Sequence, residues 1–160
     1  MNGSEIVVTA PKPRGVFVEG TINDTSYPGT AMQIVSGQTF LGGEPYWQHY
    51  APSADADPRL CAILLADTEQ GQLYSTAYAV GARCQVYCPL AGEYVNVIVA
   101  PQQGSSSANA YTIGERLVPQ HTTGQFIIES TSSIQAWFMS MEHYDAPADL
   151  IGWLWCQKQF

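Results

Sequence analysis

The stretch that decides the fold is Val86–Val118, VYCPLAGEYVNVIVAPQQGSSSANAYTIGERLV. It predicts a strand that ends at Pro89, a tight turn over Ala91–Glu93 and a long apolar strand over Tyr94–Ala100. A segment rich in Gln, Gly and Ser follows, and Ile113–Glu115 then introduces another strand. None of these segments has the composition of an active-site loop. The stretch therefore predicts the frame of a compact β-domain.

Short apolar and aromatic runs separated by turn residues continue on both sides of this frame. In Ile134–His143 the alternation of Trp137, Met139 and Met141 favours a strand over a helix. The pattern predicts an all-β fold, a single-domain β-barrel or β-sandwich of about nine to eleven short strands. The further strands expected are Thr30–Val35, Tyr46–Tyr50, Leu60–Leu65, Arg83–Pro89, Phe126–Glu129 and Leu150–Cys156.

Residues 1–20 are expected to form an extended N-terminal arm, and residues 21–160 the β-domain. Pro11 and Pro13 prevent a helix in the arm and cannot donate hydrogen bonds to a sheet. The apolar patches Ile6–Val8 and Val16–Val18 could pair as edge strands with a neighbouring subunit. A partly disordered terminus is the alternative.

Composition and charge exclude several classes of function. The chain has 160 residues, enough for one domain with its own core. Six basic and fourteen acidic residues give a net charge of -8, which argues against direct nucleic-acid binding. Charged residues make up only 12% of the chain, a feature of proteins that pack against other proteins and also of secreted β-proteins. No apolar run approaches the ~20 residues of a membrane span and no secretory signal is visible, so we expect a protein made in the cytoplasm with no membrane partner.

The four cysteines, Cys61, Cys84, Cys88 and Cys156, complete no metal motif. Cys84 and Cys88 have the spacing of half a metal site, but no second pair completes it. Positions four apart in a strand share one face, and free cysteine is among the most buried residue types. Core packing is therefore the favoured interpretation, and a disulfide or a bound metal at Cys84 and Cys88 stays open.

Histidines and carboxylates supply no recognisable catalytic motif either. A Cys–His pair could form across the fold, but the sequence contains no nucleophile elbow and no HExxH. Fourteen acidic residues would bring two carboxylates together by chance in almost any fold, so a glycosidase pair has little support. We therefore predict no enzyme, no catalytic, cofactor-binding or metal-binding residue and no cofactor. The candidates considered are His49, His121, His143, Asp55, Asp57, Asp67, Glu69, Glu93, Glu115, Glu129 and Glu142.

The aromatic residues form two clusters, Tyr46, Trp47 and Tyr50 in one and Trp153 and Trp155 in the other. Trp153 and Trp155 share one face of a strand. On an exposed face such rings make a sugar platform or an anchor for another protein, and inside they are core. The sequence favours core for one cluster and an interface for the other without deciding which. A loop over residues 104–110 could bind a partner or be a plain surface excursion.

A series of segments occurs in a fixed order from Pro28 to the C-terminus. The chain ends in a strand containing Met141 and Glu142, an acidic loop and a Trp-rich strand. The other segments are PGTAMQ (28–33), YW (46–47), AILLAD (62–67), GARCQVY (81–87), PLAGEYVNV (89–97) and IGERL (113–117). The order and spacing of these segments resemble those of the small head decoration (capsid cement) proteins of tailed bacteriophages.

The resemblance implies a non-enzymatic virion protein that forms a homo-oligomer, with a trimer favoured and a dimer possible. It would sit on the outer capsid surface and cement neighbouring major capsid protein subunits against internal DNA pressure. An arm that orders on docking would bridge subunits by strand addition, so deletion of Met1–Gly15 is expected to weaken attachment and leave the domain folded. The alternatives are a carbohydrate- or receptor-binding module that uses the aromatic clusters, and a small β-fold hydrolase.

Overall fold

The computed structural model describes residues 14–35, 44–51, 62–66, 74–100, 110–120, 122–129, 136–145 and 152–159. Within these ranges the chain is all β, with twelve strands and no helix, which confirms the predicted class. The strands are β1 (Val16–Ile22), β2 (Ala31–Ile34), β3 (Tyr46–His49), β4 (Ala62–Leu64), β5 (Arg83–Cys88), β6 (Tyr94–Val99), β7 (Ala110–Tyr111), β8 (Arg116–Pro119), β9 (Phe126–Ile128), β10 (Phe138–Ser140), β11 (Tyr144–Asp145) and β12 (Gly152–Lys158).

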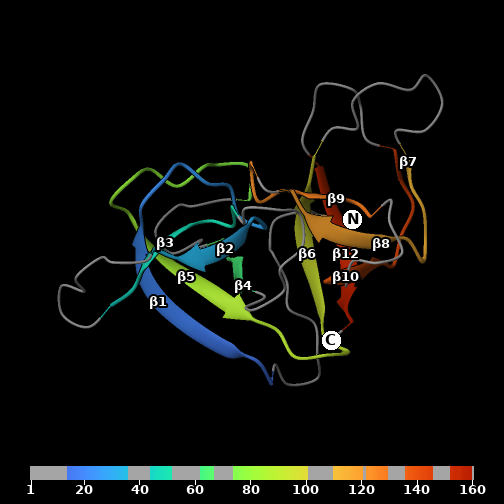
Figure 1. Ribbon diagram of the computed structural model, residues 1–160, viewed down its shortest axis with the longest axis horizontal. Helices are drawn as coiled ribbons and strands as arrows, with labels where there is room; N and C mark the ends of the chain where they lie inside the picture. Colours follow the sequence, from blue (N-terminus) through green and yellow to red (C-terminus); the bar gives the residue numbers. More distant parts are fainter. Residues whose placement is uncertain are drawn as a thin grey trace.

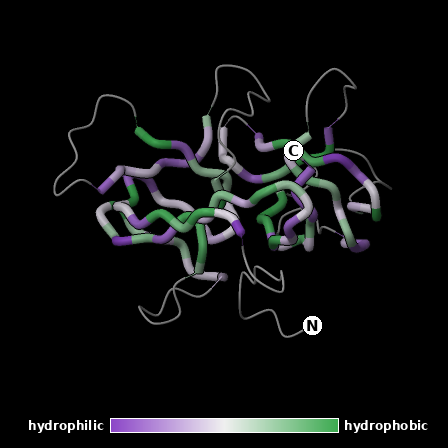
Figure 2. The backbone as a smooth tube through the Cα atoms, turned by 90° about the horizontal axis from the view of Figure 1, so that it is seen from below, coloured by the Kyte–Doolittle hydropathy of each residue, from purple (hydrophilic) through white to green (hydrophobic). Residues whose placement is uncertain are grey.

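The strands form two small closed barrels rather than one barrel or sandwich (Figure 1). Barrel 1 has the order β1-β3-β2-β4-β5, barrel 2 has the order β10-β12-β6-β9-β8, and β7 pairs with β11 in a separate two-stranded sheet. Figure 2 shows the barrels side by side, with hydrophobic stretches in both. The turn over residues 89–93, inside the stretch that decides the fold, joins one barrel to the other.

Both barrels have the same topology. Counted from the first strand of each, the order around the barrel is first, third, second, fourth and fifth. The first and third strands run parallel in both cases, β1 with β3 and β6 with β9. The other four pairs of each barrel are antiparallel. The fold therefore contains an internal repeat that the sequence does not reveal.

Five of the strands follow a turn with a glycine of positive φ two residues before the strand begins. In four of these turns the amide that follows the glycine donates to the carbonyl three residues earlier, whereas before β9 the Gly124 amide donates to the Gln120 carbonyl at 2.9 Å. In the turn before β6 the Glu93 amide donates to the Leu90 carbonyl at 3.1 Å, and in the turn before β8 the Glu115 amide donates to the Thr112 carbonyl at 3.2 Å. A positive φ at the third position of such a turn is typical of type II, which favours glycine. The five glycines are Gly29, Gly81, Gly92, Gly114 and Gly124.

One hydrophobic core extends across both barrels. Ala31, Ile63 and Tyr87 of barrel 1 pack in the same buried cluster as Val97 and Leu154 of barrel 2. Barrel 1 also has an interior cluster of its own, which consists of Ile22, Met32, Trp47, Ala62, Leu64, Tyr78, Cys84 and Val86. Because strand side chains alternate between faces, the central strands of barrel 1 fill its interior with one face and pack on barrel 2 with the other.

Two glycines bring the backbones of the barrels together. The Gly29 carbonyl accepts a hydrogen bond from the Ile98 amide at 3.1 Å, and the Gly124 carbonyl accepts one from the Ala31 amide at 2.9 Å. A Cβ on Gly29 would lie 2.7 Å from the Ile98 nitrogen, and a Cβ on Gly124 would lie 2.7 Å from the Ala31 oxygen. Only glycine permits this approach.

The N-terminal boundary differs from the prediction. Residues 16–20 belong to β1, which pairs with β5 from Val16 opposite Cys88 to Thr21 opposite Arg83. They lie in barrel 1 rather than in an arm, and their partner strand is in the same chain rather than in a neighbouring subunit. The physical reason is that the β-formers Val16–Val18 continue directly into a barrel strand. Residues 1–13 of the expected arm lie outside the described residues.

Candidate functional site

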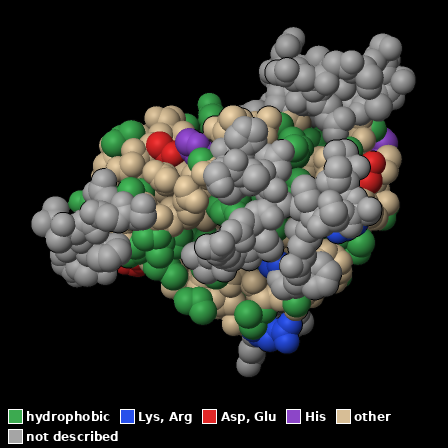
Figure 3. Space-filling model, viewed as in Figure 1, with side chains coloured by type: hydrophobic (Ala, Val, Ile, Leu, Met, Phe, Trp, Pro, Cys, Tyr) green, Lys and Arg blue, Asp and Glu red, His purple; other side chains and the backbone are tan. Residues whose placement is uncertain are grey.

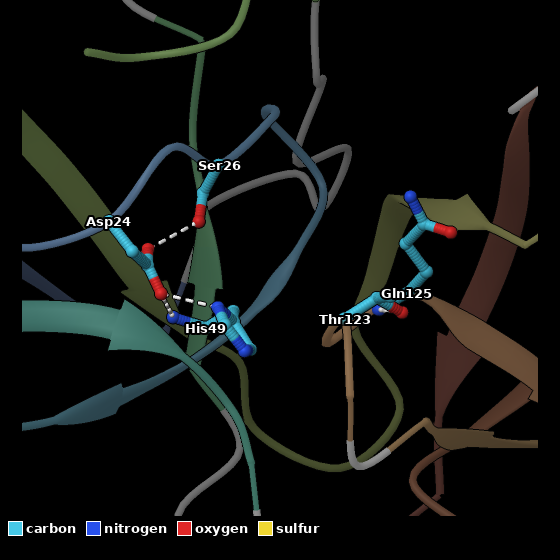
Figure 4. A network of polar contacts seen from close by, with 5 residues as sticks. All are labelled: Asp24, Ser26, His49, Thr123 and Gln125. Carbon is cyan, nitrogen blue, oxygen red and sulfur yellow. Dashed lines mark hydrogen bonds and ion pairs between the residues drawn. The ribbon is translucent and has the colours of Figure 1, made fainter. Parts of the chain in front are cut away.

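A Ser, His and Asp cluster lies at the end of β3, but its geometry is not that of a nucleophile (Figure 4). Asp24 is the centre: the Ser26 hydroxyl donates to its Oδ1 at 2.7 Å, and the His49 backbone amide donates to its Oδ2 at 2.9 Å. The His49 ring also contacts Oδ2 through Nδ1. A catalytic serine must be hydrogen-bonded to the histidine, whereas Ser26 is bonded to the carboxylate. Asp24 therefore links the segment that follows β1 to the end of β3.

The same cluster supports a turn of barrel 2. Figure 4 shows Thr123 and Gln125 across from His49, and a Cβ on Gly124 between them would lie 3.2 Å from the His49 Cβ. The Gln125 amide donates to the Thr123 hydroxyl at 3.3 Å, which closes the turn before β9. His49 thus lies at the contact between the barrels. His121 lies outside the described residues, and the exposed His143 pairs with Asp145 at 3.1 Å.

Glu93 is a buried carboxylate, only 1% exposed, at the entry to β6. It accepts hydrogen bonds from the Tyr87 hydroxyl at 2.7 Å, from the Leu90 amide at 2.7 Å and from the Arg14 amide. Burial acts to raise the pKa of Glu93, but these donors favour the ionised form and hold it below its ordinary value. Burial, together with the hydrogen bond to Glu93, raises the pKa of Tyr87 to about 12. Glu93 therefore connects the residues just before β1 with the turn that joins the two barrels.

The other described carboxylates proposed from the sequence have local structural partners. Glu115 accepts the Thr112 amide at 2.7 Å, in the same arrangement as Glu93 with Leu90. Glu142 accepts the Trp155 amide at 2.8 Å. The Glu129 side chain, 2% exposed, forms an ion pair with Arg116 at 3.2 Å. Glu129 Oε1 is buried and has no hydrogen-bond partner, whereas Oε2 makes the contact with Arg116. Asp55, Asp57, Asp67 and Glu69 lie outside the described residues.

Three cysteines are described, and all are free thiols in or against the core. Cys84 belongs to the interior cluster of barrel 1, Cys88 packs against that cluster, and Cys156 belongs to the shared core. Burial, with a contribution from the charge of Glu44, raises the pKa of Cys84 to about 12, and burial also raises the pKa values of Cys88 and Cys156. Among the described residues no group of three or more His, Cys, Asp or Glu side chains could hold a metal ion. Cys61 lies outside them.

The structure decides which aromatic cluster is core. Trp47 is 1% exposed and Tyr50 is 6% exposed, while Tyr46 is half-buried. Trp153 packs against the shared core, where its Nε1 donates to the Pro28 carbonyl at 3.0 Å. Trp155 remains half-exposed on the outside of barrel 2. The two tryptophans of β12 therefore lie on one face, as predicted, but have different surroundings.

Trp155 belongs to a surface that we call the amide–aromatic face, consisting of Tyr94, Asn96, Trp155 and Gln157. Trp155 is paired with Asn96, and Gln157 with Tyr94, on the outer side of β6 and β12. The Tyr94 and Trp155 rings are nearly parallel, 14° apart, with centroids 5.9 Å apart. The Gln157 amide donates to the Tyr94 hydroxyl at 3.0 Å. All four residues are half-exposed and uncharged.

Apolar side chains are also exposed at the barrel junction and at turn tips. Val16, Phe17 and Leu90 are 60%, 46% and 48% exposed, and they lie where β1 begins and β5 ends. Val80 and Ile113, 64% and 69% exposed, precede turn glycines. Figure 3 shows a face on which uncharged side chains predominate and charged ones stand apart. Among the described residues there is no helix long and apolar enough to cross a membrane.

A solved structure has this fold. The chain is similar to the N base of the head fiber gp8.5 of bacteriophage phi29, with a TM-score of 0.55 over 91% of this chain and 94% of that chain. Sequence identity is 10%, so the similarity concerns the fold. No protein-family model and no curated protein matches the sequence.

Proposed function

We propose that this chain is a non-enzymatic structural protein of a bacteriophage virion. It binds the outer surface of the capsid and cements neighbouring major capsid protein subunits against internal DNA pressure. The observation that carries the proposal is the similarity to a phage head fiber base over nearly the whole of both chains. This agrees with the order of sequence segments, which resembles head decoration proteins.

The use of polar groups supports a structural role. Asp24, Glu93 and Glu115 accept backbone amides, and Glu129 pairs with Arg116. Each of these carboxylates has a partner in the fold, and the described thiols lie in or against the core. An enzyme would require a nucleophile or a general base aimed at a space for substrate. The described clusters fix turns and barrel contacts.

Attachment would use the apolar side chains at the surface. Val16, Phe17 and Leu90 together offer an uncharged contact of the kind found in interface centres. An oligomer, with a trimer favoured, would multiply weak contacts, because each further contact on the same capsid is effectively intramolecular. Residues 1–13, which precede β1 in the sequence, are proposed to extend the contact.

Two measurements test cementing. Phage heads that lack the protein are incubated with it, washed and heated, and the DNA that becomes sensitive to nuclease is measured. We expect decorated heads to release DNA at a higher temperature than bare heads. Binding to the heads without a higher temperature of DNA release would contradict cementing. It would favour a role in attaching another protein to the capsid. In solution, a mass near three times 17.4 kDa supports the trimer, and a mass of one chain contradicts an oligomer.

A further inference from the structure

The amide–aromatic face has polar groups beside its two rings that are not used in hydrogen bonds within the described chain. Within the described chain neither the Trp155 indole N–H nor the Asn96 side-chain amide has a hydrogen-bond partner. These two residues lie directly opposite one another on β12 and β6. Both residues are partly exposed at the surface. Aromatic rings with polar groups beside them offer a ligand both apolar contact and hydrogen bonds.

The two rings are held in place before any ligand binds. The Gln157 amide fixes the Tyr94 hydroxyl at 3.0 Å, and Glu142 fixes the backbone of Trp155 at 2.8 Å. With centroids 5.9 Å apart and planes 14° apart, the two rings form one stacked aromatic pair. Groups that are already ordered lose little conformational entropy on binding.

We propose that the amide–aromatic face binds neutral saccharides. The C–H face of a pyranose packs on an aromatic ring, and its hydroxyl groups need the donors and acceptors that Asn96 and Trp155 leave free. The four residues carry no charge, and the chain as a whole carries -8, so the face complements an uncharged ligand and disfavours an anionic one. This function is additional to capsid attachment, and it would allow a protein on a capsid to hold a glycan-coated surface.

The test is an NMR titration of the intact protein with maltohexaose, cellohexaose and the hexamer of N-acetylglucosamine, with 3′-sialyllactose as the anionic comparison. At least one neutral oligosaccharide is expected to shift the resonances of residues 94–96 and 155–157. Trp155→Ala and Asn96→Ala are each expected to weaken that binding at least about tenfold. Phe17→Ala, which removes an exposed aromatic residue on barrel 1, is the control and should leave it unchanged.

Several outcomes would overturn the proposal. These are no shift with any neutral oligosaccharide, equal binding of sialyllactose, or binding that survives both substitutions. Shifts on this face that depend on protein concentration alone would show self-association instead. If Trp155→Ala does not fold, Asn96→Ala, which leaves both rings in place, decides the result. Attachment of both variants to capsids should be unchanged, and its loss would make the face a capsid contact.

Discussion

The hydroxyl of Tyr87, in the last strand of barrel 1, donates a 2.7 Å hydrogen bond to the carboxylate of Glu93 at the entry to barrel 2. The same hydroxyl accepts the Gly15 amide at 3.1 Å, just before β1. The start of barrel 1, its end and the start of barrel 2 therefore meet at one buried acid. The Glu93 carboxylate therefore stabilises the segment that joins the two barrels.

Glu93 should make the free energy of unfolding decrease as the pH falls into the acid range. Because its pKa is held below the ordinary value of about 4.3, its contribution is fully present above that pH and is lost as the pH falls through the lower folded value. Glu93→Gln should lower the free energy of unfolding by about 1–3 kcal/mol at pH 7, because a buried charge-assisted network is broken. Thermal unfolding followed from pH 7 to pH 3 should show a flatter acid limb for the variant.

The matched control for this measurement is Glu19→Gln. The Glu19 side chain is 66% exposed and lies 3.5 Å from Arg83. Exposed pairs of this kind contribute little, so the control should follow the unaltered protein across the whole pH range. Identical acid limbs for Glu93→Gln and Glu19→Gln would contradict the role given to Glu93.

Gly29→Ala should destabilise the protein more than Gly114→Ala. Both glycines have a φ near +90°, where a side chain costs about 1–2 kcal/mol. A Cβ at Gly29 would also lie 2.7 Å from the Ile98 nitrogen, whereas a Cβ at Gly114 would meet nothing within 4 Å. Urea unfolding should therefore show a greater loss at Gly29, by at least about 1 kcal/mol. Equal losses would mean that the close contact between the barrels contributes nothing.

Substitution of the tryptophans should separate core from surface. Trp47→Ala should cost about 3–5 kcal/mol, because the side chain fills the interior of barrel 1. Trp155→Ala should cost clearly less, because its ring is half-exposed on the outer face. Urea unfolding of the two variants measures both values, and a reversed order would contradict the assignment of the aromatic clusters.

The thiols of Cys84 and Cys156 should be inert in the native protein. Both are buried, and the pKa of Cys84 is raised to about 12, so almost no reactive thiolate exists at pH 8. Iodoacetamide labelling followed by mass spectrometry should modify both residues only after denaturation. Labelling of native Cys84 as fast as in the unfolded chain would show that barrel 1 opens readily.

Much of the strand content follows from local sequence. The Ala91–Glu93 turn and the strands on either side of it lie where the glycine and the apolar runs predict them. The sequence predicts the last strand at Leu150–Cys156, and the structure places it at Gly152–Lys158. The alternation of buried residues continues past Leu154 and Cys156 to Lys158, so the strand extends further than predicted. The short strands β7 and β11 were missed, since two residues carry no detectable periodicity.

The division into two barrels could not be predicted, because it depends on pairing between distant strands. The parallel pairs of β1 with β3 and β6 with β9 have no local signal in the sequence. The glycines in the sequence indicate the repeated turns. Glu93 and Glu115 have equivalent roles, because each accepts the backbone amide of the residue three positions earlier, Leu90 or Thr112. Trp153 and Trp155 are exposed to a similar degree but have different contacts, because only Trp153 lies where barrel 1 packs and donates to the Pro28 carbonyl.

The N-terminal segment should contribute to capsid attachment, and the structure defines how far it can be removed. Arg14 contacts Glu93 and Gly15 contacts Tyr87, so a deletion through Gly15 would also disturb the barrel junction. Deletion of residues 1–13 leaves both contacts and should preserve the unfolding temperature. Attachment of this variant should be weaker than that of the whole chain, and equal attachment would contradict a role for the segment.

Co-sedimentation of the purified protein with phage heads that lack it tests the central claim most directly. The account predicts saturable binding, with a fixed number of copies per head, and no binding to unassembled major capsid protein at the same concentration. Protein that stays in the supernatant at every concentration, with its fold verified, would contradict a role on the capsid surface.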